Sequence, residues 1–418
     1  MTASLVNVTR RSFARTLGGA SLSLFLPSGA VRAQSAAARP VLVCLFLRGG
    51  ADGLSLCVPH GHPEYYRARP RIAIPRPGKP GGAVRLDDEF GLHPRLGALE
   101  GAYRSGELAF VHAVGSPDPT RSHFDAQDNM ESALHGQSKR EGWLGRWLAS
   151  GAQTDASPLR ALALGGTPPL ALEGHAGVLS ARRLDKLSLA APHAVSEPLE
   201  DAFRRMYEQA PDGAPELAPL RRAGTGAIRA ARMLRELDVA GRRPQGGAAY
   251  PKESVALADV ATLIRAGVGL ELAWIDVGGW DTHQNQGNGE EGRLPRALAP
   301  WGAGLAAFRQ DLGDHFERVL VLVMTEFGRT LRENGSGGTD HGHGSAMLLM
   351  GGRVQGGRVL GRFPGLAAER LWQSRDLAVT TDYRDVYAEV LRDHLKHDDV
   401  AKVLPDYSPG PRLGLFRA

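Results

Sequence analysis

Seven acidic and histidine residues lie in loops directly after or before apolar segments of this 418-residue sequence. They are Asp52, Asp281, His283, Glu326, Asp340, His341 and His343. Carboxylate oxygens and imidazole nitrogens are common ligands of divalent cations. A single Asp in a glycine-rich loop is also an ordinary turn residue, and the glycines around His341 and His343 also suit a flexible exposed loop. Taken together, the seven predict a divalent-metal site.

Candidate nucleophilic hydroxyls lie in the loop Ser116 to Thr120 and at the helix start that follows this loop. Ser122 precedes Asp125 by three residues, a spacing typical of a helix N-cap. The same position would hold a nucleophilic oxygen at a helix N-terminus, where the helix dipole favours an anion and a metal lowers the hydroxyl pKa. Both interpretations of Ser122 remain open, and Thr120 is the second hydroxyl candidate.

The elements that must position these residues are buried strands alternating with helices. Apolar runs predict strands over Val41–Leu47, Leu108–Val114, Leu270–Asp276, Arg318–Met324 and Ala346–Met350. Helical periodicity predicts helices over Pro94–Arg104, Ser122–Leu134, Pro198–Gln209, Leu220–Leu237, Val255–Ala266 and Arg296–Phe316. Continuously apolar strands are buried on both faces, as in a parallel sheet covered by helices. The pattern predicts an α/β fold, a three-layer sandwich with a mostly parallel central sheet, whose strand ends carry the ligands.

The N-terminal segment has the order of an export signal. Arg10 and Arg11 precede a weakly apolar run from Thr16 to Leu26, and Ala30 to Ala33 form an A-x-A-like cleavage site. Paired arginines before a glycine- and serine-diluted run are typical of twin-arginine signals. We therefore expect residues 1–33 to be removed, Gln34 to begin the mature chain, the twin-arginine translocase to be a partner, and the protein to be periplasmic or secreted.

Charge and hydropathy argue against two other classes, nucleic-acid-binding proteins and membrane-inserted proteins. The net charge of +5 includes four arginines among residues 1–33, which contain no acidic residue, so residues 34–418 carry +1. This balance argues against nucleic-acid binding. No later segment is long and apolar enough for stable membrane insertion. We expect one domain over 34–418, with a cap or insertion around 143–213.

Five motifs together resemble a family of uncharacterised twin-arginine-exported bacterial proteins, related by fold to the alkaline phosphatase and sulfatase superfamily. The motifs are Arg48-Gly-Gly-Ala-Asp52-Gly, Arg121-Ser-His-Phe-Asp125, Gly279-Trp-Asp-Thr-His283, Thr325-Glu-Phe-Gly-Arg329 and Gly338-Thr-Asp-His-Gly-His343-Gly. The resemblance implies an alkaline-phosphatase-like fold with one or two metals. It implies that Asp52, Asp281 and His283 are ligands, that His343 or His341 is the final histidine, and that Ser122 is the nucleophile.

Two positions depart from the superfamily pattern. Glu326-Phe327 stands where the enzymes usually have Asp-His, and because Phe327 cannot bind a metal, a one-metal site or a loss of catalysis becomes credible. Cys57-Val58-Pro59 begins like the sulfatase C-x-P-x-R sequence, but Gly61 replaces its arginine, so we do not assign Cys57 as the nucleophile.

These observations predict an exported hydrolase of phosphate or sulfate esters that uses zinc, calcium or manganese. Ser122 would attack the anionic ester substrate, and Arg48 or Arg121 would hold its anionic oxygens together with the cation. The alternative is a non-catalytic extracytoplasmic binding protein that retains the phosphatase-like fold, which Phe327 favours.

Overall fold

The computed structural model describes residues 39–136, 141–151, 157–175, 177–184, 201–203, 205–207, 218–238, 241 and 243–417. The predicted signal peptide and Gln34 lie outside these residues. Among the residues described, no helix has both the length and the apolar character needed to cross a bilayer.

A nine-stranded sheet forms the centre of the molecule. Its order is β11-β5-β10-β9-β1-β8-β6-β7, with β12 paired to β5. The strands are β1 Val41–Leu47, β5 Leu108–Gly115, β6 Ala161–Leu164, β7 Val178–Ala181, β8 Leu272–Val277, β9 Val319–Met324, β10 Ser345–Gly351, β11 Arg358–Leu360 and β12 Thr381–Asp382. Only β10 runs antiparallel to its neighbours in this sheet, so the predicted mostly parallel α/β sheet is confirmed.

Strand β1 lies at the middle of the sheet between β8 and β9, and all seven of its residues are buried. Val43 and Leu45 belong to one core cluster, together with apolar side chains of the helices on that face. Cys44 and Phe46 belong to a second core cluster on the other face. Successive side chains of a strand point to opposite faces, so a strand covered on both sides must be apolar throughout.

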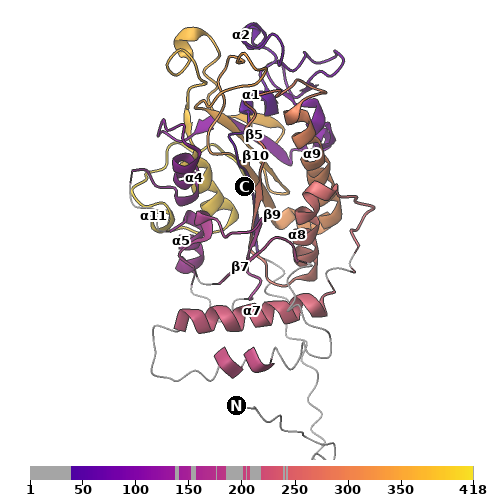
Figure 1. Ribbon diagram of the computed structural model, residues 1–418, viewed down its shortest axis with the longest axis vertical. Helices are drawn as coiled ribbons and strands as arrows, with labels where there is room; N and C mark the ends of the chain where they lie inside the picture. Colours follow the sequence, from indigo (N-terminus) through magenta and orange to yellow (C-terminus); the bar gives the residue numbers. More distant parts are fainter. Residues whose placement is uncertain are drawn as a thin grey trace, which may run out of the picture.

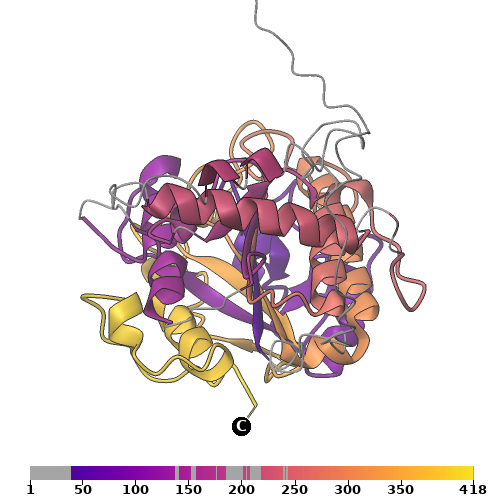
Figure 2. The ribbon, with the colours of Figure 1, turned by 90° about the horizontal axis from the view of Figure 1, so that it is seen from below.

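Helices cover both faces of the sheet and make the three layers visible in Figure 1. One layer contains α8 (Val255–Ala266) and α9 (Arg293–Leu312), and the other contains α4 (His123–Ser132), α5 (Trp143–Ser150) and α11 (Val400–Val403). Helix α7 (Ala218–Glu236) lies across the end of the molecule near β7 (Figure 2). Other α-helices in the described part of the chain are α1 Gly53–Leu56, α2 Pro63–Ala68, α3 Glu100–Arg104 and α10 Tyr383–Glu389, and a small sheet contains β2 Cys57–Val58, β3 Val84–Arg85 and β4 Gly91–Leu92.

The segment expected to form a cap or insertion, 143–213, contributes in part to the central sheet. Strands β6 and β7 extend the sheet beyond β8 through parallel pairing. The reason is local, because Ala161–Leu164 is an apolar four-residue run that is buried on both faces. Of the helix predicted over Pro198–Gln209, the structure describes residues 201–203 and 205–207, which are helical.

The parallel strands β1, β8 and β9 end at the same edge of the sheet. Leu47 lies opposite Val277, and Phe46 lies opposite Met324. The loops that begin at Arg48, Gly278 and Thr325 therefore leave the sheet side by side. This is the edge at which open α/β sheets bind ligands.

Candidate metal centre

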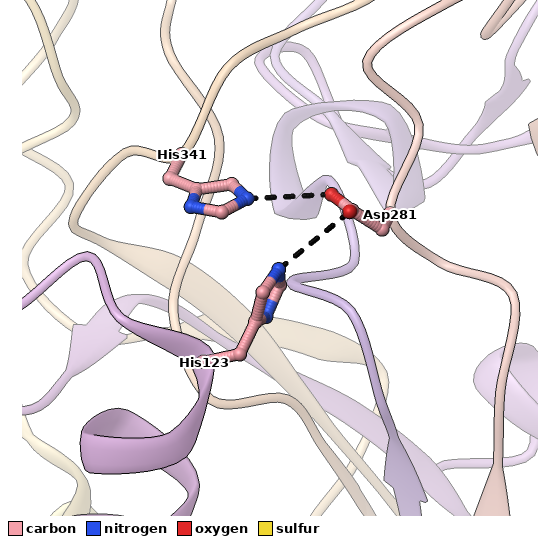
Figure 3. Close-up of side chains that lie close together, drawn as sticks. All are labelled: His123, Asp281 and His341. Carbon is pink, nitrogen blue, oxygen red and sulfur yellow. Dashed lines mark hydrogen bonds and ion pairs between the residues drawn. The ribbon is translucent and has the colours of Figure 1, made fainter.

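Three side chains from different parts of the chain converge at this edge. His123 is the first residue of α4, Asp281 lies in the loop after β8, and His341 lies in the loop before β10. One ligand atom from each lies within 4.8 Å of the others, and Figure 3 shows both imidazoles turned toward the Asp281 carboxylate. His283 joins them, because its Nε2 lies 3.1 Å from Asp281 Oδ1 and 3.0 Å from His341 Nε2.

Each of the three imidazoles is fixed through its other nitrogen. Nδ1 of His123 lies 2.8 Å from Glu326 Oε1, and Nδ1 of His341 lies 2.8 Å from the backbone oxygen of Arg121. Nδ1 of His283 lies 3.1 Å from Asp340 Oδ1. Carboxylate and carbonyl oxygens only accept hydrogen bonds, so a proton on Nδ1 satisfies each of these contacts, and in that tautomer Nε2 has the lone pair that a metal ion needs. The hydrogen bond to Glu326 also raises the pKa of His123, so a metal ion would compete with a proton for Nε2 of this residue. Metal-binding histidines are typically oriented by such a partner.

The spacing of the converging atoms suits a small ion. Asp281 Oδ1 lies 3.3 Å from His341 Nε2, and Asp281 Oδ2 lies 3.7 Å from His123 Nε2. Ligand atoms about 2.0–2.1 Å from a tetrahedral zinc ion are separated by about 3.3 Å from one another. The Nε2 atoms of His283 and His341 lie 3.0 Å apart, a separation that either a shared proton or a bound cation can stabilise. The donor set therefore fits a divalent metal ion.

Glu326 contacts His123 but is not one of the residues whose ligand atoms converge. The carboxylate is buried and accepts hydrogen bonds from the Gly49 backbone N–H at 2.8 Å and from Gln127 Nε2 at 3.0 Å, in addition to His123. Burial acts to raise the pKa of Glu326, but the hydrogen bonds from His123 and Gln127 outweigh burial and lower this pKa. Glu326, predicted as a ligand, therefore lies where an anionic partner orients His123.

A buried arginine holds the carboxylate of the cluster. Arg329 donates to Asp281 Oδ1 at 2.5 Å and to the backbone oxygens of Gly50 and Thr339 at 2.6 and 2.9 Å. Burial acts to raise the pKa of Asp281, but Arg329 outweighs burial and lowers it. Burial lowers the pKa of His341, which favours the neutral imidazole that a metal requires.

Two of the predicted ligands have other partners. Asp52 is fully buried and receives hydrogen bonds from Arg69 at 2.5 and 3.0 Å, from Ser55 at 2.7 Å and from Gln286 at 2.7 Å. Both of its oxygens are therefore occupied by an internal ion pair. His343 packs against Trp372 with ring centroids 5.1 Å apart and does not belong to the cluster.

The predicted catalytic side chains also have neighbours. Arg48 pairs with Glu131 at 2.6 Å and Asp276 at 2.9 Å, and Arg121 pairs with Asp376 at 2.7 Å. Ser122 is the N-cap of α4, as its spacing predicted, but its Oγ accepts from the Asp125 backbone N–H at 3.4 Å. This distance exceeds the usual N–H···O range of about 2.7–3.2 Å, so the cap bond is weak.

His123 and Arg329 are the site residues that sequence reasoning missed. Both stand inside the motifs quoted above, one residue after Ser122 and three residues after Glu326. Phe327 packs against both ligand rings, 5.0 Å from His123 and 4.8 Å from His341 between centroids. For His123, the signal available in the sequence was a histidine at the start of a helix that follows a predicted strand.

The ion pair of Asp52 gives a testable prediction about stability. Asp52→Asn leaves Arg69 buried without its counter-charge, and breaking such a pair costs about 3–5 kcal/mol. We expect urea unfolding to show this loss, with metal content per folded molecule unchanged. Asp88→Asn, which alters a fully exposed carboxylate paired to Arg85, should leave the free energy of unfolding close to wild type. A folded Asp52→Asn protein without metal would instead make Asp52 a ligand.

The fold and the cluster define a three-layer α/β protein with a histidine-rich centre at the carboxyl edge of its sheet. The chain belongs to the DUF1501 family of proteins of unknown function, whose model matches residues 39–407. No curated protein matches the sequence.

Solved structures with a similar fold include two hydrolases. The PsFucS1 sulfatase from Pseudoalteromonas sp. is 12% identical with a TM-score of 0.38, and the match covers 92% of this chain and 74% of that one. The phosphonate monoester hydrolase of Agrobacterium radiobacter is 11% identical with a TM-score of 0.33, and the match covers 90% and 79% of the two chains.

Proposed function

We propose that the protein is an exported, metal-dependent hydrolase of phosphate or sulfate esters. The observation that carries this proposal is the convergence of the Nε2 atoms of His123, His283 and His341 on the Asp281 carboxylate. The cluster lies at the edge of the sheet where ligands bind in this fold class. The five motifs resemble an uncharacterised exported family that is related by fold to the phosphatase and sulfatase superfamily, and this relation supports the reaction class.

The donor set favours one late first-row ion. Three imidazoles and one carboxylate suit zinc better than calcium or manganese, which prefer oxygen ligands. Among the residues that the structure describes, the centre contains the single group of at least three histidine, cysteine or acidic residues with this spacing. A bound cation would polarise the ester and neutralise charge that develops on its oxygens.

The chain's own groups would bind and attack the ester. The N-terminus of the ten-residue helix α4 presents a partial positive charge to an anion. Ser122 Oγ, held only by the weak contact at 3.4 Å, is free to turn toward a bound ester. In this proposal Ser122 is the nucleophile.

A non-catalytic binding protein is the second candidate function. Arg48 and Arg121, the expected anion-binding residues, each pair with a carboxylate. Phe327 lies against two of the ligand rings, where the superfamily enzymes carry a histidine. Both features favour a site that binds a metal without turnover.

Metal analysis with a hydrolysis assay separates the two functions. We expect the purified chain to contain about one metal ion and to hydrolyse an aryl phosphate or an aryl sulfate. A chelator should abolish this activity, and zinc should restore it better than calcium. Stoichiometric metal without hydrolysis of either ester would favour the binding protein.

Export is tested independently of the site. Replacing Arg10 and Arg11 with lysines should abolish periplasmic accumulation, because twin-arginine signals are read through that pair. Fractionation and immunoblotting would measure the change, with Arg15→Lys as the control. Undiminished periplasmic protein would contradict a twin-arginine route.

A further inference from the structure

A cleft of about 560 Å³ opens at the same edge of the sheet. One wall is a face of α4, where Phe124, Gln127, Asp128 and Glu131 recur at helical spacing. The opposite wall contains Gly165 and residues 167–170, which follow β6, and Arg48 and Asp276 line the cleft between the walls.

The side-chain amide of Gln127 connects the cleft to the metal centre through hydrogen bonds. Gln127 Oε1 accepts from Arg48 Nη1 at 2.8 Å inside the cleft. Its Nε2 donates at 3.0 Å to Glu326 Oε1, the same oxygen that holds His123. Phe124, on the cleft wall, directly follows His123 in the chain. A ligand in this cleft would therefore lie beside a group bound at the metal.

The charges that line the cleft are mainly negative. Asp128, Glu131 and Asp276 line it together with one cationic side chain, Arg48. Burial raises the pKa of Glu131 although Arg48 opposes this effect. Even with Glu131 neutral, two carboxylates face one guanidinium. The cleft therefore disfavours a second anionic group and attracts a cation.

An exposed aromatic ring also favours a cation in this cleft. The side chain of Phe124 is 84% exposed, the largest value among the large apolar side chains described. Pro168 and Pro169 add apolar surface on the opposite wall. An aromatic face with nearby carboxylates is the combination that binds ammonium groups, because the ring and the carboxylates both attract positive charge.

We propose that this cleft binds an ammonium group on the alcohol part of the ester substrate. The inference rests on the proposed function, because the cleft would bind the cationic end of a zwitterionic substrate whose anionic ester group binds at the metal. The anionic ester group lies at the metal, and the cationic end lies against Phe124 and Asp128. The opposite charges of the two regions select the orientation of such a substrate.

Binding of the alcohol alone tests the inference without requiring turnover. Choline carries a trimethylammonium group, and dimethylbutanol has the same shape with carbon in place of the charged nitrogen. We expect calorimetric titration of the metal-loaded protein to show choline binding about tenfold tighter than dimethylbutanol. Equal affinities for the two alcohols would overturn the inference.

Three variants of exposed side chains test whether Phe124 and Asp128 bind the ammonium group of choline. Asp128→Asn should weaken choline binding several-fold and leave dimethylbutanol binding unchanged. Phe124→Leu keeps the apolar surface but removes the ring, so it should also weaken choline selectively. Asp125→Asn removes the same charge from the same helix outside the cleft and is the matched control. Unchanged choline affinity in both cleft variants would place the cation elsewhere and reject the proposal.

Hydrolysis measured in parallel distinguishes the two proposals. If aryl esters are hydrolysed but choline has no advantage over dimethylbutanol, the cleft inference fails and the proposed function stands. If choline binds selectively but no ester is hydrolysed, the proposed function fails and the cleft remains a cation site. Choline sulfate and choline phosphate hydrolysed with a lower KM than the dimethylbutyl esters would support both.

Discussion

His341→Ala should yield a folded protein that has lost its metal. The variant removes one ligand, and even the loss of a partner that orients a ligand typically lowers metal affinity by about 10- to 100-fold. We therefore expect a loss of affinity above 100-fold, measured by competition with a chromophoric chelator, together with loss of ester hydrolysis.

His343→Ala is the matched control, because it removes a histidine two residues away in the same loop. His343 packs against Trp372 and takes no part in the cluster. We expect His343→Ala to keep its metal at wild-type affinity. Retention of metal by His341→Ala, or its loss only from His343→Ala, would show that the ion is bound by another set of residues.

Ser122→Ala should lower turnover by about four to six orders of magnitude, the scale on which removing a nucleophile acts. The metal content should remain unchanged. The N-cap bond is long at 3.4 Å, so we expect a stability loss near the lower end of the range of about 0.5–2 kcal/mol typical of caps. Steady-state kinetics, metal analysis and thermal unfolding together separate the catalytic role from the cap.

Thr120→Ala provides the comparison for Ser122. Thr120 Oγ1 accepts a hydrogen bond from the Ser122 backbone N–H at 3.2 Å, so it belongs to the same loop without capping the helix. We expect this variant to remain active. An inactive Thr120→Ala beside an active Ser122→Ala would transfer the role to Thr120, and activity in both would exclude a hydroxyl nucleophile in this loop.

Strands β1, β5, β8, β9 and β10 were predictable because each forms a largely apolar run in the sequence. Val41–Leu47 is apolar at every position, and the structure gives β1 the same bounds. Strands β6 and β7 were not predicted. Ala161–Leu164 is apolar but only four residues long, and Val178–Ala181 is equally short and only half buried. The helix start at Ser122 was found from its cap spacing, which is a local property.

The site was less predictable because its contacts join distant segments. Asp52 looks like a free carboxylate in a glycine-rich loop until the fold brings Arg69 against it. The sequence pattern indicates only that His123 belongs to a helix start, because its partner Glu326 lies 203 residues later in the chain. Sequence patterns identify residues that are able to bind a metal, but the choice between ligand and supporting partner depends on packing.

The position of β1 has a consequence for synthesis of the chain. This strand is made first, yet the β8 and β9 residues beside it begin at Leu272 and Val319. At about 5–20 residues per second, the seven apolar residues of β1 leave the ribosome roughly 10–45 s before a neighbouring strand exists. An uncharged, proline-free apolar segment of this length is prone to self-association. We therefore expect the yield of folded protein to depend on how well chaperones cover this strand during translation.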